Sequence, residues 1–179
     1  ENMSNLYCRN CKTESELSNS LYGCLNCLEK GIQHPVEIKY NLENINQDFL
    51  HVSSNNKPHT IWRWSELLPH TKNKITLGEG NTPLIESKKI AEELKIGKFF
   101  FKYEGSNPTG SFKDRLNAIA FSKGKDLNLK NATVSSSGNQ GVSLAAYSYA
   151  ANMKSIIFCP PYVEDKIIKE LLLRNAIPV

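Results

Sequence analysis

The feature that most restricts the fold of this chain is the regular alternation of strand-like and helix-like segments after residue 97. Short apolar or β-branched runs alternate there with longer stretches whose apolar residues recur every three or four positions. We expect strands at 98–103, 132–135 and 155–159 and helices at 111–127, 139–152 and 163–175. Strands that alternate with helices of this length usually lie parallel in one sheet, and each helix crosses over between two strands. The predicted class is therefore α/β, a parallel sheet with crossover helices.

Two further segments precede this alternation. Residues 1–40 contain four cysteines among short strand-like runs, and residues 41–74 form a polar, asparagine-rich connector. We expect a short helix at 61–68, with Trp62 and Trp64 as packing anchors, and another helix at 88–94. The predicted division of the chain is 1–40, 41–74 and 75–179.

The composition is that of a soluble globular protein, with 40% hydrophobic and 22% charged residues in a chain of 179. The net charge of +4 is spread along the chain without a basic block, so we expect no nucleic-acid partner. No apolar run approaches the ~18 residues of a membrane span, and no signal-peptide core follows the polar start. We therefore expect a cytoplasmic location without membrane association. The apolar ending Ile177-Pro178-Val179 and a first residue other than Met lead us to expect coding sequence beyond Val179.

The cysteines of the first segment form two Cys-x-x-Cys pairs, Cys8 with Cys11 and Cys24 with Cys27, separated by 12 residues. Four thiolates at this spacing suit a closed tetrahedral zinc site with a structural role, as in a zinc ribbon. The alternative is two unrelated pairs of free or oxidised thiols. The fifth cysteine, Cys159, lies in an apolar strand and is expected to be a small buried hydrophobic residue.

The turn from Glu104 to Arg115 lies between a predicted strand and a predicted helix. Its Asn107-Pro108-Thr109-Gly110 segment has turn chemistry, and Ser111 with Asp114 forms a helix-start pattern in which Ser111 is the expected N-cap. Lys113 then lies in the first helical turn, where the helix dipole disfavours a cation. A neutral lysine amine can attack an aldehyde to form a Schiff base. The alternative is a solvated lysine paired with Asp114 or Glu104.

A second loop, Ser135 to Gly141, joins a predicted strand to the start of a predicted helix. Its small residues allow a ligand to approach the backbone, and its free N–H groups and hydroxyls suit a carboxylate or phosphate. Asn139 could hydrogen-bond a ring oxygen. The alternative is an ordinary turn capped by Ser137 or Asn139. If both loops follow strands of one parallel sheet, they open onto the same crevice.

Taken together, these segments resemble the pyridoxal-phosphate (PLP) enzymes of the tryptophan-synthase-β fold type, also called fold type II. The resemblance is carried by the run from Asn107 to Arg115, by the asparagine of Ser136-Ser137-Gly138-Asn139 26 residues after Lys113, and by the segment from Gly78 to Leu84. With the cysteine pairs in front, the chain is most similar to the N-terminal portion of threonine synthases, which convert O-phosphohomoserine and water to threonine and phosphate.

The resemblance also implies roles for individual residues. Lys113 would hold the cofactor as a Schiff base and, once displaced by substrate, move protons as general acid and base. Asn139 would contact the 3′-oxygen of PLP and Phe112 would flank it. Ser136, Ser137 and Gln140 would lie near the carboxylate of a small amino-acid substrate. The full-length protein could be a homodimer.

The chain departs from the family pattern in two places. No glycine-rich loop for the cofactor phosphate follows Gly141, and Gln140 stands where many relatives carry threonine. We therefore expect these residues alone to bind PLP weakly and to show no turnover. Two alternatives remain: another PLP lyase of this fold, of the threonine dehydratase, cysteate synthase or diaminopropionate ammonia-lyase type, or a zinc-ribbon module without catalysis.

Overall fold

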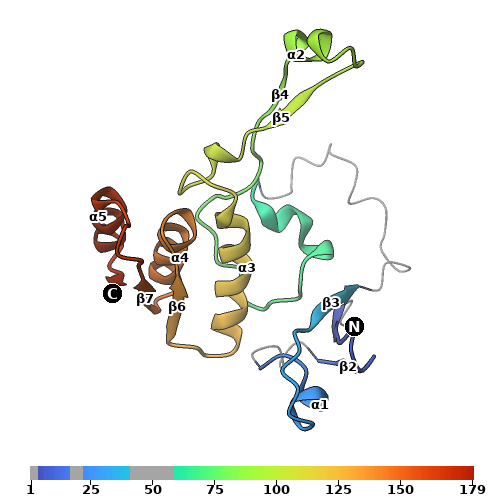
Figure 1. Cartoon of the computed structure of the whole chain (residues 1–179), viewed down its shortest axis with the longest axis vertical. Coiled ribbons are helices and arrows are strands. Elements are labelled where there is room, and N and C mark those ends of the chain that lie inside the picture. The colour runs from blue at the N-terminus through green and yellow to red at the C-terminus, as the bar shows by residue number, and fades with distance from the viewer. Residues whose placement is uncertain (1–3, 17–21, 41–58) are drawn as a thin grey trace. The chain divides into compact units, whose positions relative to one another are not determined.

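A computed structural model describes residues 4–16, 22–40 and 59–179 of the chain, which divides into two compact units. The first unit holds the described residues up to 40 together with 64–70. The second holds 59–63 and 71–179. Figure 1 shows the helices and strands of both units.

The first unit contains a three-stranded antiparallel sheet with the order β2-β1-β3. Its elements are β1 (Ser4–Tyr7), β2 (Glu14–Ser15), α1 (Leu25–Leu28) and β3 (Glu37–Tyr40). The side chains of Cys8, Cys24 and Cys27 form a buried cluster in this unit, and Cys11 and Val36 pack against it. A core this small removes little apolar surface from water. We therefore expect the folded first unit to need a source of stability in addition to its core.

The chain after residue 59 forms a hairpin and a three-stranded parallel sheet. Its elements are η3 (Ile61–Leu67), β4 (Leu84–Glu86), α2 (Lys88–Glu93), β5 (Phe100–Lys102), η4 (Glu104–Ser106), α3 (Lys113–Asp126), β6 (Asn131–Ser135), α4 (Asn139–Ala150), β7 (Lys154–Phe158), α5 (Asp165–Leu173) and β8 (Ile177–Pro178). β4 and β5 pair antiparallel, whereas β6, β7 and β8 pair parallel in that order. In Figure 1, α2 lies at the end of the β4–β5 hairpin, and α4 packs between α3 and α5. Among the described residues, no helix is long and apolar enough to cross a membrane.

The core of the second unit lies where α4 packs on β6 and β7. Ala145 and Tyr147 of this helix are fully buried, as is Ile157 of β7. Gly141 allows the close approach, because a Cβ at this position would lie only 3.0 Å from Cγ2 of Ile157. The start of α4 is therefore held tightly against the sheet, which fixes the loop that precedes it.

The prediction that one parallel sheet contains all the strands is wrong for the segment 98–103. Its strand, β5, pairs antiparallel with β4, with Phe101 opposite Ile85, and does not join β6. All three residues of β5 are exposed, whereas a strand inside a parallel sheet is buried on both faces. The parallel sheet with crossover helices is thus limited to β6, β7 and β8.

The remaining predicted helices and strands after residue 60 are confirmed to within two residues at each end. The helix predicted at 61–68 is a 3₁₀ helix, η3, in which Trp64 has non-helical dihedral angles. Trp62 is a packing anchor as predicted, since it is buried and its Nε1 donates to the carbonyl of Ile75 at 2.9 Å. Part of the predicted connector, residues 41–58, lies outside the described residues, and the boundaries at 40 and 74 stay predictions.

Candidate functional site

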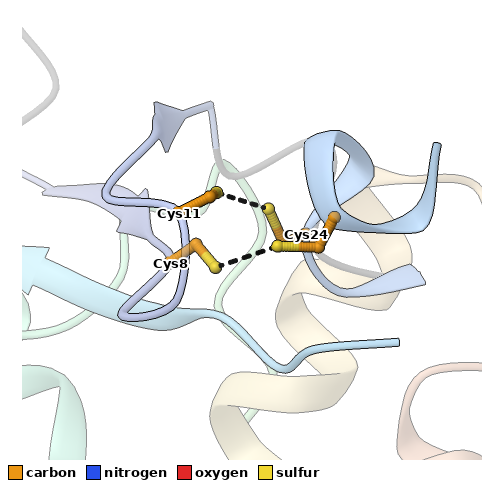
Figure 2. Close-up of side chains that lie close together, drawn as sticks. Cys8, Cys11 and Cys24 are labelled. Carbon is orange, nitrogen blue, oxygen red and sulfur yellow. Dashed lines mark hydrogen bonds between the residues drawn. The ribbon is translucent and has the colours of Figure 1, made fainter. Parts of the chain in front are cut away.

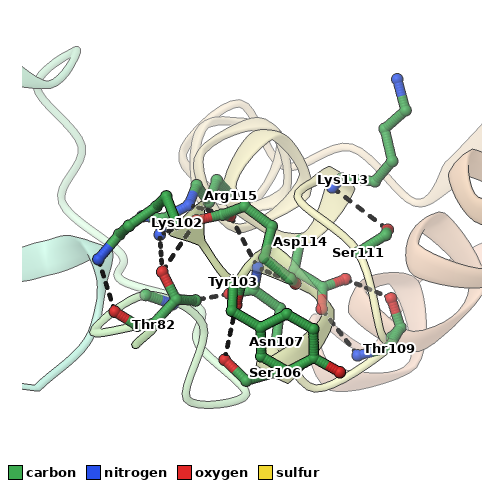
Figure 3. Close-up of polar contacts among 12 residues, drawn as sticks. Thr82, Lys102, Tyr103, Ser106, Asn107, Thr109, Ser111, Lys113, Asp114 and Arg115 are labelled. Atoms are coloured by element: carbon green, nitrogen blue, oxygen red, sulfur yellow. Dashed lines mark hydrogen bonds and ion pairs between the residues drawn. The ribbon is translucent and has the colours of Figure 1, made fainter. Parts of the chain in front are cut away.

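Lys113 is the first residue of α3, at the end of a turn that begins after β5. Its side chain is half-buried, and its Nζ lies 4.5 Å from the centroid of the Phe112 ring. Figure 3 shows this side chain extending away from the carboxylate of Asp114. In the part of the chain that the structure describes, Lys113 has no ion pair, which contradicts the alternative of a lysine paired with Asp114 or Glu104. The amine is therefore available to a ligand.

The start of α3 differs from the predicted capping box. The N-cap position is Phe112, with helical dihedral angles, although the Ser111 hydroxyl still accepts a bond from the Lys113 N–H at 3.3 Å. Asp114 does reach back, but to the N–H and hydroxyl of Thr109, at 2.7 and 2.5 Å. The reason is the tight turn closed by the bond from the Gly110 N–H to the Asn107 carbonyl at 2.8 Å, which brings Thr109 near the helix start.

An ion pair between Glu104 and Arg115 closes the turn that carries Lys113. The guanidinium donates to both carboxylate oxygens, at 2.7 and 2.8 Å, in a bidentate arrangement. The hydroxyl of Thr82 and the amide of Asn107 also donate to this carboxylate, each at 2.9 Å. The bonds from Arg115, and then those from Asn107 and Thr82, lower the pKa of Glu104 to about 2 against the opposing effect of burial. Figure 3 shows Thr82, Asn107 and Arg115 of this cluster.

The segment 76–84 is also hydrogen-bonded to the turn that carries Lys113. The Gly80 N–H donates to Oδ1 of Asn107 at 3.0 Å. Gly80 has a φ of +99°, and a Cβ there would lie 2.7 Å from the backbone nitrogen of Ile61. Next to it, the buried carboxylate of Glu79 accepts from the hydroxyl of Tyr147 at 2.6 Å. Burial, and then the bond to Glu79, raises the pKa of that tyrosine far above its usual value.

The second loop presents free polar groups at the start of α4. The Ser136 hydroxyl accepts from the N–H groups of Gly138 and Gly141, at 3.2 and 2.9 Å, so Ser136 and not Ser137 or Asn139 caps this turn. Ser137 and Asn139 are exposed, and their side chains make no hydrogen bond within the described residues. Gln140 differs, because its Nε2 donates to Oδ1 of Asn117 on α3 at 3.3 Å.

Helix packing brings the two loops together, although they do not follow strands of one sheet. α3 and α4 lie side by side, as Figure 1 shows. Asp114, next to Lys113, accepts from the hydroxyl of Ser143 at 2.6 Å, one turn after Asn139. An amine and a set of unpaired hydrogen-bonding groups at a helix N-terminus can together hold an aldehyde and an anionic group. PLP has the aldehyde and an amino-acid substrate has the anionic carboxylate, so Lys113 and the start of α4 fit these two parts of a PLP site.

Sequence reasoning missed two bonded carboxylates of the site, the buried Glu79 and the half-buried Glu104. Glu79 and Glu104 lie in turn-rich segments, where charged residues are usually solvated. A signal for Glu79 existed in its position between two glycines, since such a carboxylate can approach the backbone closely. The partner of each residue lies far away in the sequence, Tyr147 for Glu79 and Arg115 for Glu104, and local patterns do not reveal it.

The first unit brings all four predicted cysteine ligands together. Their sulfur atoms lie within 4.8 Å of one another, with 3.7 Å between Cys8 and Cys27 and 3.4 Å between Cys11 and Cys24. Figure 2 shows the sulfur atoms of Cys8 and Cys11 directed toward the segment that carries Cys24. Zinc–sulfur bonds of about 2.3 Å in a tetrahedron require sulfur atoms ~3.8 Å apart, so the cluster fits the ion. Hydrogen bonding with the side chains of Thr13 and Asn26 lowers the pKa of Cys11 to about 5, which favours a thiolate. Burial and the neighbouring thiols raise the pKa of Cys24 and Cys27.

The last predicted cysteine, Cys159, is half-buried, and its thiol donates to the carbonyl of Ile157 at 3.6 Å. It is thus less buried than expected, and it lies outside the four-cysteine cluster.

Comparison with known proteins identifies the family. A family model described as "Pyridoxal-phosphate dependent enzyme" matches residues 75–175. The chain belongs to this family. The match spans both loops described above.

Curated relatives narrow the similarity within this family. A threonine synthase from Methanosarcina acetivorans is 30% identical over 158 residues, which cover 88% of this chain and 37% of the relative. A threonine synthase from Methanocaldococcus jannaschii is 36% identical over 127 residues, covering 70% and 31%. The chain thus spans about a third of the length of these relatives. In fold, a diaminopropionate ammonia lyase from Escherichia coli is similar, with a TM-score of 0.53 at 17% identity over 59% of this chain and 32% of that one.

Because the ion pair between Glu104 and Arg115 requires an ionised carboxylate, we expect the free energy of unfolding to depend on pH. The pKa of Glu104 is depressed in the folded state relative to 4.5, so its stabilising effect is complete above that value and is lost as the pH falls toward 2. At pH 7, Glu104→Gln should lower the free energy of unfolding by about 1–3 kcal/mol, with allowance for partial solvent screening. The difference in free energy of unfolding between Glu104→Gln and wild type should become smaller as the pH falls from 4.5 to 3, as measured by urea denaturation.

Glu86→Gln is the matched control, because Glu86 is an exposed carboxylate of the same unit with no bond to another described residue. Its free energy of unfolding should differ from wild type by less than about 0.5 kcal/mol at every pH. A Glu104→Gln deficit that stays constant between pH 7 and 3 would contradict the assigned ion pair.

Proposed function

We propose that this chain carries the cofactor-binding lysine of a PLP-dependent enzyme of the threonine synthase type, which converts O-phosphohomoserine and water to threonine and phosphate. The observation that carries the proposal is the position of Lys113. Its amine makes no ion pair with the described residues, and it lies at the start of α3, which is hydrogen-bonded to α4 through Asp114 and Ser143. The similarity to curated threonine synthases over 88% and 70% of the chain supports this choice of reaction.

Each predicted site residue has a proposed role at this pair of loops. PLP supplies an electron sink for the amino-acid substrate when it is bound. The Lys113 amine holds the cofactor aldehyde and afterwards accepts and returns a proton at the substrate carbon. Asn139 donates to the 3′-oxygen through its free amide, and the exposed ring of Phe112 lies beside the cofactor.

The substrate carboxylate is proposed to bind at the start of α4. The helix dipole and unpaired N–H groups there favour an anion. Ser137 contributes its free hydroxyl, while Ser136 contributes mainly by holding the loop, since its hydroxyl already binds two N–H groups. Gln140 lies beside this site, with its amide directed to Asn117.

The four-cysteine cluster is proposed to hold one structural zinc ion in a ribbon formed by residues 1–40. Cys8, Cys11, Cys24 and Cys27 would be its ligands. Four thiolates leave no open coordination position, so the ion would stabilise the first unit and take no part in chemistry.

A test of the cofactor site is the visible Schiff-base absorbance after addition of excess PLP. Wild type should develop the band, and Lys113→Ala should lose it, because the amine that attacks the aldehyde is absent. Lys125→Ala is the matched control, an exposed lysine of the same helix, and should keep the band. If Lys113→Ala and wild type give equal bands, the assignment of Lys113 is wrong.

Release of phosphate from O-phosphohomoserine distinguishes threonine synthase from the other PLP lyases of this fold. We expect release from a polypeptide extended to the length of the curated relatives, and its loss in the Lys113→Ala variant. A polypeptide that binds PLP but instead deaminates threonine or diaminopropionate would replace the proposed reaction with one of the alternatives.

Metal analysis tests the ribbon. The purified chain should contain about one zinc per molecule, and removal of the metal by a chelator should lower the melting temperature of the first unit. Cys11→Ser should lose most of the zinc, whereas Cys159→Ser, which lies outside the cluster, should retain it. Equal zinc in both variants would show that the four cysteines are not its ligands.

A further inference from the structure

Beneath the two loops, a continuous series of side-chain hydrogen bonds joins α3 to α4. Gln140 donates to Asn117 at 3.3 Å, Asn117 donates to Ser143 at 2.8 Å, and Ser143 donates to Asp114 at 2.6 Å. Asn117 is 2% exposed, and both Ser143 and Asp114 are fully buried. These four residues (Gln140, Asn117, Ser143 and Asp114) form a relay that is buried except at the half-buried Gln140. At its three buried members, no solvent is present to replace a lost bond.

The donors and acceptors of the relay fix its orientation. The Ser143 hydroxyl has one proton, which it gives to Asp114, so it must accept from Asn117. The carboxylate of Asp114 is held from its other side by the N–H and hydroxyl of Thr109. The polar side-chain atoms of Asn117, Ser143 and Asp114 are all bonded, whereas Oε1 of Gln140 has no partner among the described residues. The three bonded side chains have one low-energy arrangement, because rotation of any of them leaves a buried polar atom unpaired.

The ends of the relay are adjacent in sequence to the two residues proposed to bind the cofactor. Asp114 follows Lys113 directly, and Gln140 follows Asn139. Figure 3 shows Asp114 bound to the turn that leads to Lys113. A shift of either helix start would therefore break a bond of the relay.

We infer that Asn117 and Ser143 are positioning residues that set the placement of the Lys113 amine relative to the Asn139 loop. The inference rests on the proposed function for its catalytic consequence, but the coupling of the two loops is a property of this chain alone. Apolar side chains at these positions could pack the α3–α4 interface equally well. The polar side chains of Asn117 and Ser143 are thus better explained by the fixed arrangement of the two loops than by an added free energy of folding.

Amide hydrogen exchange tests the coupling without any cofactor. Ser143→Ala should raise exchange in both the lysine turn and the loop 136–141, by about tenfold, the effect of losing one buried hydrogen bond. Ser148→Ala is the matched control, since Ser148 is a similarly buried serine of α4 whose hydroxyl has no partner among the described residues. It should leave exchange in both loops unchanged.

A second variant keeps the test decisive if Ser143→Ala does not fold. Gln140 is only half-buried, and Gln140→Leu removes its donor while keeping its bulk. We expect faster exchange in the lysine turn on the other helix. Unchanged exchange there in every folded relay variant would overturn the inference.

The catalytic consequence is measured by the rate at which PLP and borohydride label Lys113, read by mass spectrometry. At a temperature where both variants are folded, Ser143→Ala should be labelled about tenfold more slowly than Ser148→Ala. Labelling at the wild-type rate would overturn the positioning role. If wild type itself is not labelled at Lys113, the proposed function fails, whereas the exchange result still decides whether the loops are coupled.

Discussion

The bidentate ion pair between Glu104 and Arg115 is the contact on which the arrangement of the turns in the second unit depends. It joins the end of the β4–β5 hairpin to the first turn of α3. Because Thr82 and Asn107 donate to the same carboxylate, the segments before and after the hairpin meet at one charge. The position of Lys113 follows from this closure and from the bonds that Thr109 donates to Asp114. Among residues 4–16, 22–40 and 59–179, no side chain forms a hydrogen bond or ion pair with the Lys113 amine itself.

The sequence allowed most elements to be predicted, but not all of their pairings. Helix and strand periods are local, and α3, α4, β6 and β7 accordingly lie within two residues of the predicted ranges. The partner of β5 is not a local property. The partner of a short aromatic strand depends on which neighbouring strand its connections allow it to reach. β4 is separated from β5 by the short connection through α2, whereas β6 is separated from β5 by the longer segment that contains α3, and β5 pairs with β4.

The sequence allowed candidate site residues to be proposed, but it did not reveal the geometry that holds them. Motif spacing indicated Lys113, Asn139 and the four cysteines, and the structure places the cysteines together as expected. The bonds that orient the lysine turn were less predictable. Glu104 and Arg115 lie 11 positions apart, and Glu79 and Tyr147 lie 68 positions apart. The second of these contacts depends on the packing of α4, which no single segment specifies.

Gly80 carries a consequence for how similar sequences are compared. A methyl group there would meet the backbone at Ile61, whereas Gly78, with a comparable φ of +101°, has open space around it. One glycine is thus required by packing, and the other only by backbone conformation. A protein that shares this glycine-containing segment therefore shares a local chain path, and the segment alone says little about which molecule that protein transforms. Substrate choice must be inferred from the groups lining the two loops, which can change while the path remains.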